Sequence, residues 1–353
     1  MSYLSLMNSS KIAGYNYSTK IARELTISNQ QNVIELNRLK ESLKKEYNKN
    51  DKRFVILGVP EGIGPYANRG RNGAYGAWEA FLLSFNQYSD KEVLNKTIIL
   101  GNVYLEDLQR KSEYYDNKII DDRKELSRMV NQIDERVTPI LRTIISNNLV
   151  PIVIGGGHNN AYPLIKESAK QNESKAISCI SLDLHADLRK TDGRHSGNSF
   201  SYAFENNLLQ KYYIFGLHEN YHSKEYYRKV ENLRKEDKID FSTYTQIMED
   251  FQTSYKEQMG RALHWLENEK VQDIGLEVDL DSVEGVPASA ITELRIPLKF
   301  TIDFVKKVNL NYAPVYFNLS EGAPDLGKRN SKKVVGDTIS QLIYAFIENY
   351  ASK

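Results

Sequence analysis

Short apolar runs alternate with helical stripes along most of the chain. Eight runs have the length and the Gly, Pro or polar boundaries that are typical of buried strands, and they span residues 54–60, 97–101, 150–154, 176–180, 212–217, 239–241, 273–278 and 314–319. Helical periodicity lies between several of these runs, for example where Met129, Ile133, Val137 and Leu141 recur every fourth residue. Strands that alternate with helices predict an α/β fold with a mainly parallel sheet covered on both faces.

The N-terminal segment has a different pattern. Residues 1–27 are polar and show no clear periodicity, which predicts an arm. A capping-box spacing at Ser28 and Gln31 then opens a predicted helix. No linker or repeat divides the rest of the chain. We therefore predict an N-terminal arm and helix followed by a single α/β domain, over residues 1–50 and 51–353.

Three of the predicted strands end in residues that commonly bind metals. Ligands in open α/β sheets converge at the carboxyl ends of strands, and side chains at spacing two in an extended segment point to the same side. The candidate ligands follow the runs 150–154, 176–180 and 273–278, and they are His158, Asp183, His185, Asp187, Asp279 and Asp281.

The number and type of these ligands indicate a pair of metal ions. Six ligands are too many for one small cation, whereas two cations about 3.5–4 Å apart can share carboxylates and activate a water between them. Carboxylate and imidazole donors without thiolate favour Mn²⁺, with Ni²⁺, Fe²⁺, Co²⁺ or Zn²⁺ possible.

Charge and composition limit the partners and the compartment. A net charge of +1 creates no field that attracts polyanions, so we expect neither a nucleic-acid nor a membrane-surface partner. No apolar run reaches the roughly 18 residues of a membrane span, and the N-terminus lacks a signal-peptide pattern. Cys179 is the one cysteine, which fits a reducing compartment. We expect a cytoplasmic protein.

The ligand motifs and two others, in this order, resemble those of the ureohydrolases, the family of arginase, agmatinase and formimidoylglutamase. The motifs are Gly156-Gly157-His158, Asp183-Leu184-His185-Ala186-Asp187, Ser196-Gly197-Asn198, Asp279-Leu280-Asp281 and Ser320-Glu321-Gly322. The loop at 68–74 also looks like the N-terminal loop of that family. The resemblance runs from about residue 54 to 348 and leaves residues 1–50 uncovered.

The resemblance implies an arginase-like fold, a three-layer α/β/α sandwich with a mainly parallel eight-stranded sheet. It also implies two Mn²⁺ per chain, hydrolysis of a C–N bond in a guanidino or formimidoyl group, and a homo-oligomer. Carried over to this chain, one metal would bind His158, Asp183, Asp187 and Asp279, and the other would bind Asp183, His185, Asp279 and Asp281. Asp183 and Asp279 would then be the bridges.

Two departures from arginases and agmatinases resemble formimidoylglutamase. Gly157 stands where those enzymes have an acid, and Phe200 stands where they have a proton-shuttling histidine. Arg189 follows the metal motif as in the formimidoylglutamase branch, where it could bind a substrate carboxylate through two hydrogen bonds. Further candidates for contact with substrate are Arg194 and Asn198.

We therefore expect a metal-dependent hydrolase that converts N-formimidoyl-L-glutamate and water to L-glutamate and formamide in histidine degradation. Asp281 is the candidate for orienting the nucleophile and relaying a proton, and Glu321 or His195 for polarising the substrate. One alternative is a ureohydrolase that acts on agmatine, arginine or a guanidino acid. The other is a catalytically silent, metal-binding member, because the loop at 285–297 departs from the family pattern.

Overall fold

The structure is a computed structural model. It describes residues 4–6, 39–45, 53–85, 87, 91–172, 175–218, 224–250, 253–268, 273–290 and 292–351.

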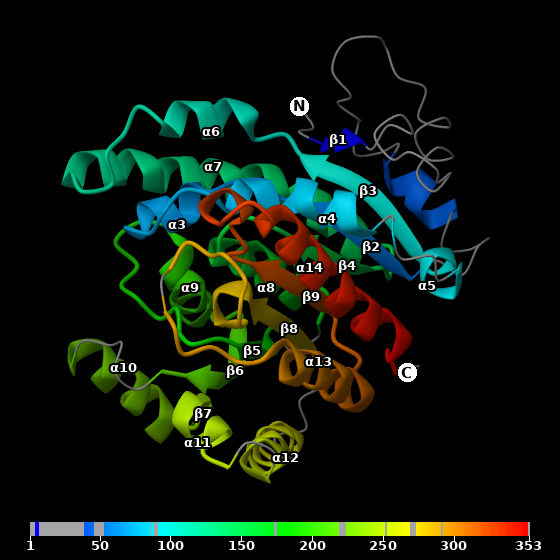
Figure 1. Cartoon of the computed structure of the whole chain (residues 1–353), viewed down its shortest axis with the longest axis vertical. Coiled ribbons are helices and arrows are strands. Elements are labelled where there is room, and N and C mark those ends of the chain that lie inside the picture. Colours follow the sequence, from blue (N-terminus) through cyan, green and yellow to red (C-terminus); the bar gives the residue numbers. More distant parts are fainter. Residues whose placement is uncertain are drawn as a thin grey trace.

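Within these described residues, nine strands form one sheet at the centre of the molecule (Figure 1). The strands are β1 (Leu4–Leu6), β2 (Phe54–Gly58), β3 (Thr97–Val103), β4 (Val150–Ile154), β5 (Ile177–Leu182), β6 (Leu209–Leu217), β7 (Ile239–Thr243), β8 (Ile274–Asp279) and β9 (Tyr316–Ser320). Their order is β1-β3-β2-β4-β9-β8-β5-β6-β7. Strands β2 to β9 pair in parallel, whereas β1 is antiparallel to β3.

The eight predicted strands correspond to β2 to β9, so the mainly parallel eight-stranded sheet is confirmed. β1 adds an edge strand that the sequence analysis missed, because three residues in a polar segment carry no periodic pattern.

Helices cover both faces of the sheet. One face packs against α7 (Ile120–Ile145), α8 (Ala161–Ala169), α9 (Ser199–Glu205) and α10 (Lys224–Lys235). The other packs against α4 (Ala77–Phe85), α12 (Thr253–Asn268), α13 (Leu298–Tyr312) and α14 (Ser331–Glu348). Shorter helices are α3 (Ile63–Ala67), α5 (Lys91–Asn95), α6 (Glu106–Ser112) and α11 (Tyr244–Met248).

Alternation along the strands divides the interior into two cores. In β2, Val55 and Leu57 join the core under α7, while Phe54 and Ile56 join the core under α4 and α14. A pleated strand turns successive side chains to opposite faces, so an uninterrupted apolar strand supplies both cores at once. The predicted three-layer α/β/α sandwich is confirmed.

The described part of the N-terminal segment belongs to the same body. β1 pairs with β3, and Leu39 and Leu43, from a helical segment at 39–45, are buried in the core under α7. The rest of the helix predicted from Ser28 lies outside the described residues. The division of the chain at residue 50 stays a prediction.

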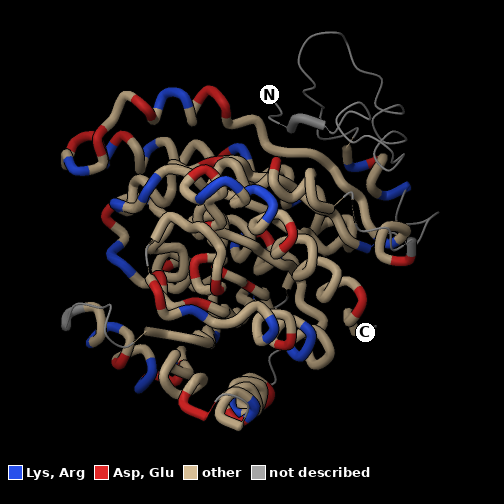
Figure 2. Tube along the Cα trace, viewed as in Figure 1, with Lys and Arg blue, Asp and Glu red and all other residues tan. Residues whose placement is uncertain are grey.

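Lysine, arginine and acidic residues are mixed along the chain and over the molecule (Figure 2), as a net charge of +1 suggests. None of the helices in the described part is both long and apolar enough to span a bilayer. Cys179 is buried in β5, where its Sγ lies 3.2 Å from Tyr316 Oη.

Candidate metal centre

The carboxyl ends of four adjacent strands form the site. β4, β9, β8 and β5 are neighbours in this order, and parallel strands place their carboxyl ends at the same edge of a sheet. The predicted ligands follow β4, β5 and β8, and Glu321 follows β9. The structure brings all six predicted metal ligands together at this edge.

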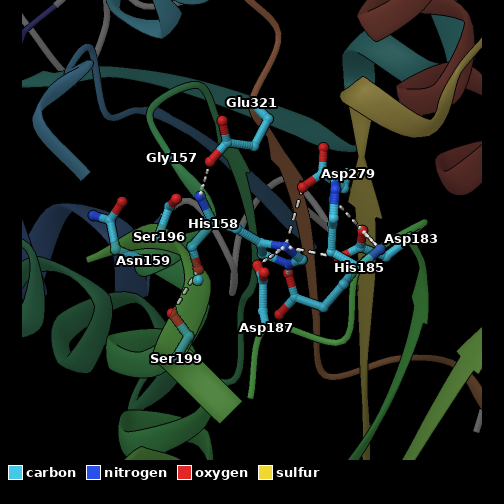
Figure 3. A network of polar contacts seen from close by, with 12 residues as sticks. Gly157, His158, Asn159, Asp183, His185, Asp187, Ser196, Ser199, Asp279 and Glu321 are labelled. Atoms are coloured by element: carbon cyan, nitrogen blue, oxygen red, sulfur yellow. Dashed lines mark hydrogen bonds and ion pairs between the residues drawn. The ribbon is translucent and has the colours of Figure 1, made fainter. Parts of the chain in front are cut away.

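His158 lies at the centre of the first ligand group (Figure 3). Its Nδ1 atom is 3.2 Å from Asp183 Oδ2, 3.1 Å from Asp187 Oδ2 and 3.3 Å from Asp279 Oδ2. The four ligand atoms all lie within 4.8 Å of one another, and the four residues are buried. This is the ligand set that the resemblance implied for the first metal.

His185 organises the second group. Its Nδ1 atom is 3.6 Å from Asp183 Oδ1 and 3.4 Å from Asp281 Oδ2. Asp183 therefore belongs to both groups and offers one oxygen to each. Asp279 belongs to the first group alone, and its Oδ1 accepts the Asp281 backbone N–H at 2.8 Å. The bridging role of Asp279 stays a prediction.

The chemistry of the cluster fits a pair of cations. His158 Nδ1 and Asp183 Oδ2 are buried without a hydrogen bond of good geometry, which normally costs about 1–3 kcal/mol per group. Burial and the neighbouring Asp281 and Asp183 raise the pKa of Asp279 well above its usual value. Cations would neutralise the crowded carboxylates and bind the unpaired atoms. Imidazole and carboxylate donors suit Mn²⁺ and related first-row metals.

Unusual backbone conformations shape three of the strand ends. After β4, Gly155 and Gly156 have φ values of +87° and +73°. Asp187 and Glu321 also have positive φ, +48° and +63°, which non-glycine residues rarely adopt. A Cβ atom on Gly156 would lie 2.7 Å from Glu61 Oε1. Conformations of this kind persist where the surroundings hold them, and they cluster at functional sites.

Glu61 holds the glycine loop at 155–157 in place through hydrogen bonds. Its Oε1 accepts the Gly157 N–H at 2.6 Å and Asn160 Nδ2 at 3.3 Å, and its Oε2 accepts the Gly64 N–H at 2.8 Å. Burial raises the pKa of Glu61. The sequence analysis did not single out Glu61, because one acid in a glycine-rich loop forms no recognisable motif.

Glu321 closes the site from β9. One carboxylate oxygen accepts the His158 backbone N–H at 3.0 Å, and the other accepts the Ser289 hydroxyl. Burial raises the pKa of Glu321 to about 8, although both hydrogen bonds oppose the increase. Its carboxyl group lines the pocket described next. The predicted catalytic role of Glu321 stays a prediction.

A pocket of about 1020 Å³ opens over the cluster and has a basic rim. Five of its lining residues are acids or a histidine of the site, namely His185, Asp187, Asp279, Asp281 and Glu321. Seven more are cations, namely Arg69, Arg71, Arg123, Lys124, Arg189, Lys190 and Lys229. Asp192 is the only other acid among the lining residues. The field of this rim attracts a ligand whose outer end is negative.

Six of these seven cations were missed as site residues in the sequence analysis, which singled out Arg189 alone. They come from the first turns of α7, from α10, and from the loops after α3 and β5. Arg69 and Arg71 lie in the recognised loop at 68–74, which was the one available signal. The others belong to charged stretches that look like ordinary exposed surface.

Two of the three predicted substrate-binding residues lie behind the pocket. Arg194 is 2% exposed, and its guanidinium donates to Asp134 at 2.8 and 3.3 Å, to Asn198 Oδ1 at 3.1 Å and to the Asn159 carbonyl at 2.8 Å. Asn198 is buried and also donates to the Lys190 carbonyl at 2.9 Å. Both side chains brace the loop and do not line the pocket; Arg189, which is exposed, does.

His195 lines the pocket with a neutral imidazole ring. Burial, together with Arg189 and Arg194, lowers the pKa of His195 to about 3. Its Nδ1 accepts the Gly197 N–H at 3.2 Å, which places the ring hydrogen on Nε2. This geometry makes His195 a neutral hydrogen-bond donor, and its role in polarising the substrate stays a prediction.

Phe200 supports His158 and does not reach the pocket. Its ring is fully buried, meets the edge of the His158 ring at a centroid distance of 5.3 Å and stacks on Tyr212 at 4.0 Å. Phe200, which was predicted to occupy the place of the shuttling histidine of arginases and agmatinases, is therefore an apolar brace in this chain.

The arginase family model matches residues 52–292, which is more than half of the 353 residues. The chain belongs to the arginase family. A curated member of this family, the formimidoylglutamase of Streptococcus pyogenes serotype M3, is 25% identical over 281 residues, which cover 77% of each chain.

Solved structures of the arginase family share the fold. The formimidoylglutamase of Bacillus subtilis aligns with a TM-score of 0.63 at 17% identity, over 84% of this chain and 88% of that one. The formiminoglutamase of Trypanosoma cruzi, solved with two Mn²⁺, aligns with a TM-score of 0.63 at 18% identity, over 87% and 98%. Family membership and the two ligand groups support a metal-dependent hydrolase.

Proposed function

We propose that this arginase-family chain hydrolyses N-formimidoyl-L-glutamate to L-glutamate and formamide. Water adds its oxygen to the formimidoyl carbon, the bond from that carbon to the glutamate nitrogen breaks, and that nitrogen gains a proton. The named relatives support this substrate. The observation that carries the proposal is the basic rim over the acidic cluster.

The charge of the pocket selects among the substrates that the family handles. Formimidoylglutamate carries one carboxylate on the carbon next to the formimidoyl nitrogen and a second at the far end of its side chain, and the second would meet the rim. Agmatine is cationic at both ends, so seven lining cations would repel it. Arg189 is one of the exposed cations of this rim, and it lies two positions after Asp187, the last residue of the metal motif. A guanidinium can bind a carboxylate through two parallel hydrogen bonds.

The residues around the cluster would have different roles in the reaction. Metal ions held by the two groups would supply a water acidic enough to act as a nucleophile at neutral pH. Asp281 lines the pocket beside His185, with 3.4 Å between Oδ2 and Nδ1. We infer that its carboxylate orients the nucleophile and passes a proton to the leaving nitrogen. His195 can donate from Nε2 to the substrate.

A substrate panel on the Mn²⁺-loaded protein tests the proposal. We expect formamide release from formimidoylglutamate and little urea release from agmatine or arginine. The Asp281→Asn variant should lose the activity and remain folded. Turnover of a guanidino compound without turnover of formimidoylglutamate would overturn the proposed substrate. Equal, near-zero rates for wild type and Asp281→Asn on every compound would favour a catalytically silent protein.

A further inference from the structure

We propose that Glu277 is a positioning residue that fixes the orientation and tautomer of His158 toward a cation. Glu277 lies in β8 and His158 follows β4, with β9 between these strands in the sheet. The inference rests on the metal site of the proposed function and is independent of its substrate. Nothing in the sequence analysis pointed to Glu277, because it stands inside an apolar run that predicts a strand.

Glu277 is an acid in a position that packing alone would leave to an apolar residue. It is fully buried in the middle of the sheet. A buried carboxylate without an opposite charge is costly, because it loses its hydration without compensation. In the described part of the chain, Glu277 forms an ion pair with His158, and Glu277 Oε2 lies 3.3 Å from His158 Nε2. Among the described residues, His158 is therefore the partner of this carboxylate that can carry an opposite charge.

Neutral donors hold the carboxylate in this orientation. Tyr316 Oη donates to Glu277 Oε1 at 2.7 Å, and Asn318 Nδ2 donates to Oε2 at 2.7 Å. The sheet register pairs Glu277 with Asn318 and Gly275 with Tyr316. A Cβ atom on Gly275 would overlap the Tyr316 ring, so the glycine leaves the space through which the ring reaches Glu277.

The two ring nitrogens of His158 face groups of different chemistry. Nδ1 faces the carboxylates of Asp183, Asp187 and Asp279, at 3.1–3.3 Å. A neutral imidazole binds a cation through the nitrogen that carries no hydrogen. Nδ1 must therefore be that nitrogen, and Nε2 carries the hydrogen that Glu277 accepts. A carboxylate in this place orients the ring and makes it a stronger ligand.

The test measures metal affinity at fixed pH and needs no substrate. Glu277→Gln keeps the size of the side chain and removes its charge. We expect one of two Mn²⁺ equivalents to bind about 10–100-fold more weakly, because partners of this kind have effects of that size, while the other equivalent keeps its affinity. Free Mn²⁺ is measured by electron paramagnetic resonance during the titration. Nitrogen NMR of the Zn²⁺-loaded protein should show the hydrogen on His158 Nε2 in the wild type.

Two further variants complete the experiment. Glu167→Gln is the matched control, because Glu167 is a buried acid of α8 that bonds Arg142 and Lys170 away from the site; it should bind Mn²⁺ like the wild type. Tyr316→Phe removes one hydrogen bond from Glu277 and should give a smaller loss at the same equivalent. If Glu277→Gln does not fold, the Mn²⁺ affinity of Tyr316→Phe tests the proposal instead.

The proposal would be overturned by an unchanged Mn²⁺ affinity in the folded Glu277→Gln variant. If only Tyr316→Phe folds, an unchanged affinity in that variant has the same consequence. An equal loss in Glu167→Gln, or a loss shared equally by both equivalents, would also overturn it. Inactivity toward formimidoylglutamate bears on the proposed function alone, since these titrations contain no substrate.

Discussion

Replacing Arg194 by methionine should destabilise the protein by about 3 kcal/mol. Methionine retains an aliphatic stem between Tyr162 and Tyr202, whose rings lie 4.8 and 5.1 Å from the guanidinium. The substitution leaves the Asp134 carboxylate without its cation. Breaking a buried ion pair on one side costs about 3–5 kcal/mol. The lower end applies here, because 14% of the Asp134 side chain remains exposed.

Urea unfolding of the metal-free protein measures this effect in a double-mutant cycle with Asp134→Asn. Burial raises the pKa of Asp134, and Arg194 opposes that increase. Without Arg194 the pKa of Asp134 rises further, so the folded variant takes up a proton as the pH falls. The difference in unfolding free energy between wild type and Arg194→Met should therefore shrink from pH 7 to pH 5.

Two outcomes would refute this reasoning about Arg194. One is a loss below about 1 kcal/mol, the size expected of an exposed pair. The other is an equal loss in the Asp134→Asn background, because the pair would then contribute no coupling energy.

Three more predictions follow from the site. Arg189→Ala should raise KM for formimidoylglutamate about 10–100-fold with kcat nearly unchanged, because a hydrogen bond to a charged group contributes about 1.5–3 kcal/mol. Steady-state kinetics measure this change, and an unchanged KM would contradict the prediction. Mn²⁺ at 100 times its Kd should stabilise the wild type by about 2.7 kcal/mol, and Asp183→Asn, which loses the shared carboxylate, should lose most of that gain in thermal unfolding. Burial and the nearby arginines lower the pKa of His195 to about 3 in the folded protein. As the pH falls, His195 therefore takes up a proton in the unfolded chain before it does so in the folded protein. The stability that is present above about pH 6.5 is lost as the pH falls toward 3. His195→Gln should lose less unfolding free energy from pH 7 to pH 5 than the wild type, and equal losses would count against the shift.

The metal ligands could be recognised in the sequence because their chemistry is local. Asp183, His185 and Asp187 lie within five residues of one another after one strand, and Asp279 and Asp281 after another. Extended backbone turns residues at spacing two to the same side. The structure gathers these ligands at one edge, although β5 ends at Leu182, Asp281 lies in a short 3-10 helix at Leu280–Ser282, and Asp187 takes a left-handed conformation.

The residues that support the site could not be recognised in this way. Glu61 and Glu277 are separated from His158 by 97 and 119 positions, as the difference in residue numbers shows. Each is a single acid with no repeated spacing around it. Arg194 could not be assigned from the sequence either. It looks like a possible anion-binding residue there, whereas its guanidinium donates to Asp134 on α7 in the structure.

The sequence by itself determined the strands, the α/β class and the six candidate ligands, because apolar periodicity and short ligand spacings are properties of neighbouring residues. The tertiary structure alone decided the order β4-β9-β8-β5, which unites the ligand-bearing strand ends with Glu321. It also decided which arginine faces the pocket and which is buried behind it. These outcomes depend on contacts between distant segments, whose pairing is chosen by the packing of the whole sheet and its helices.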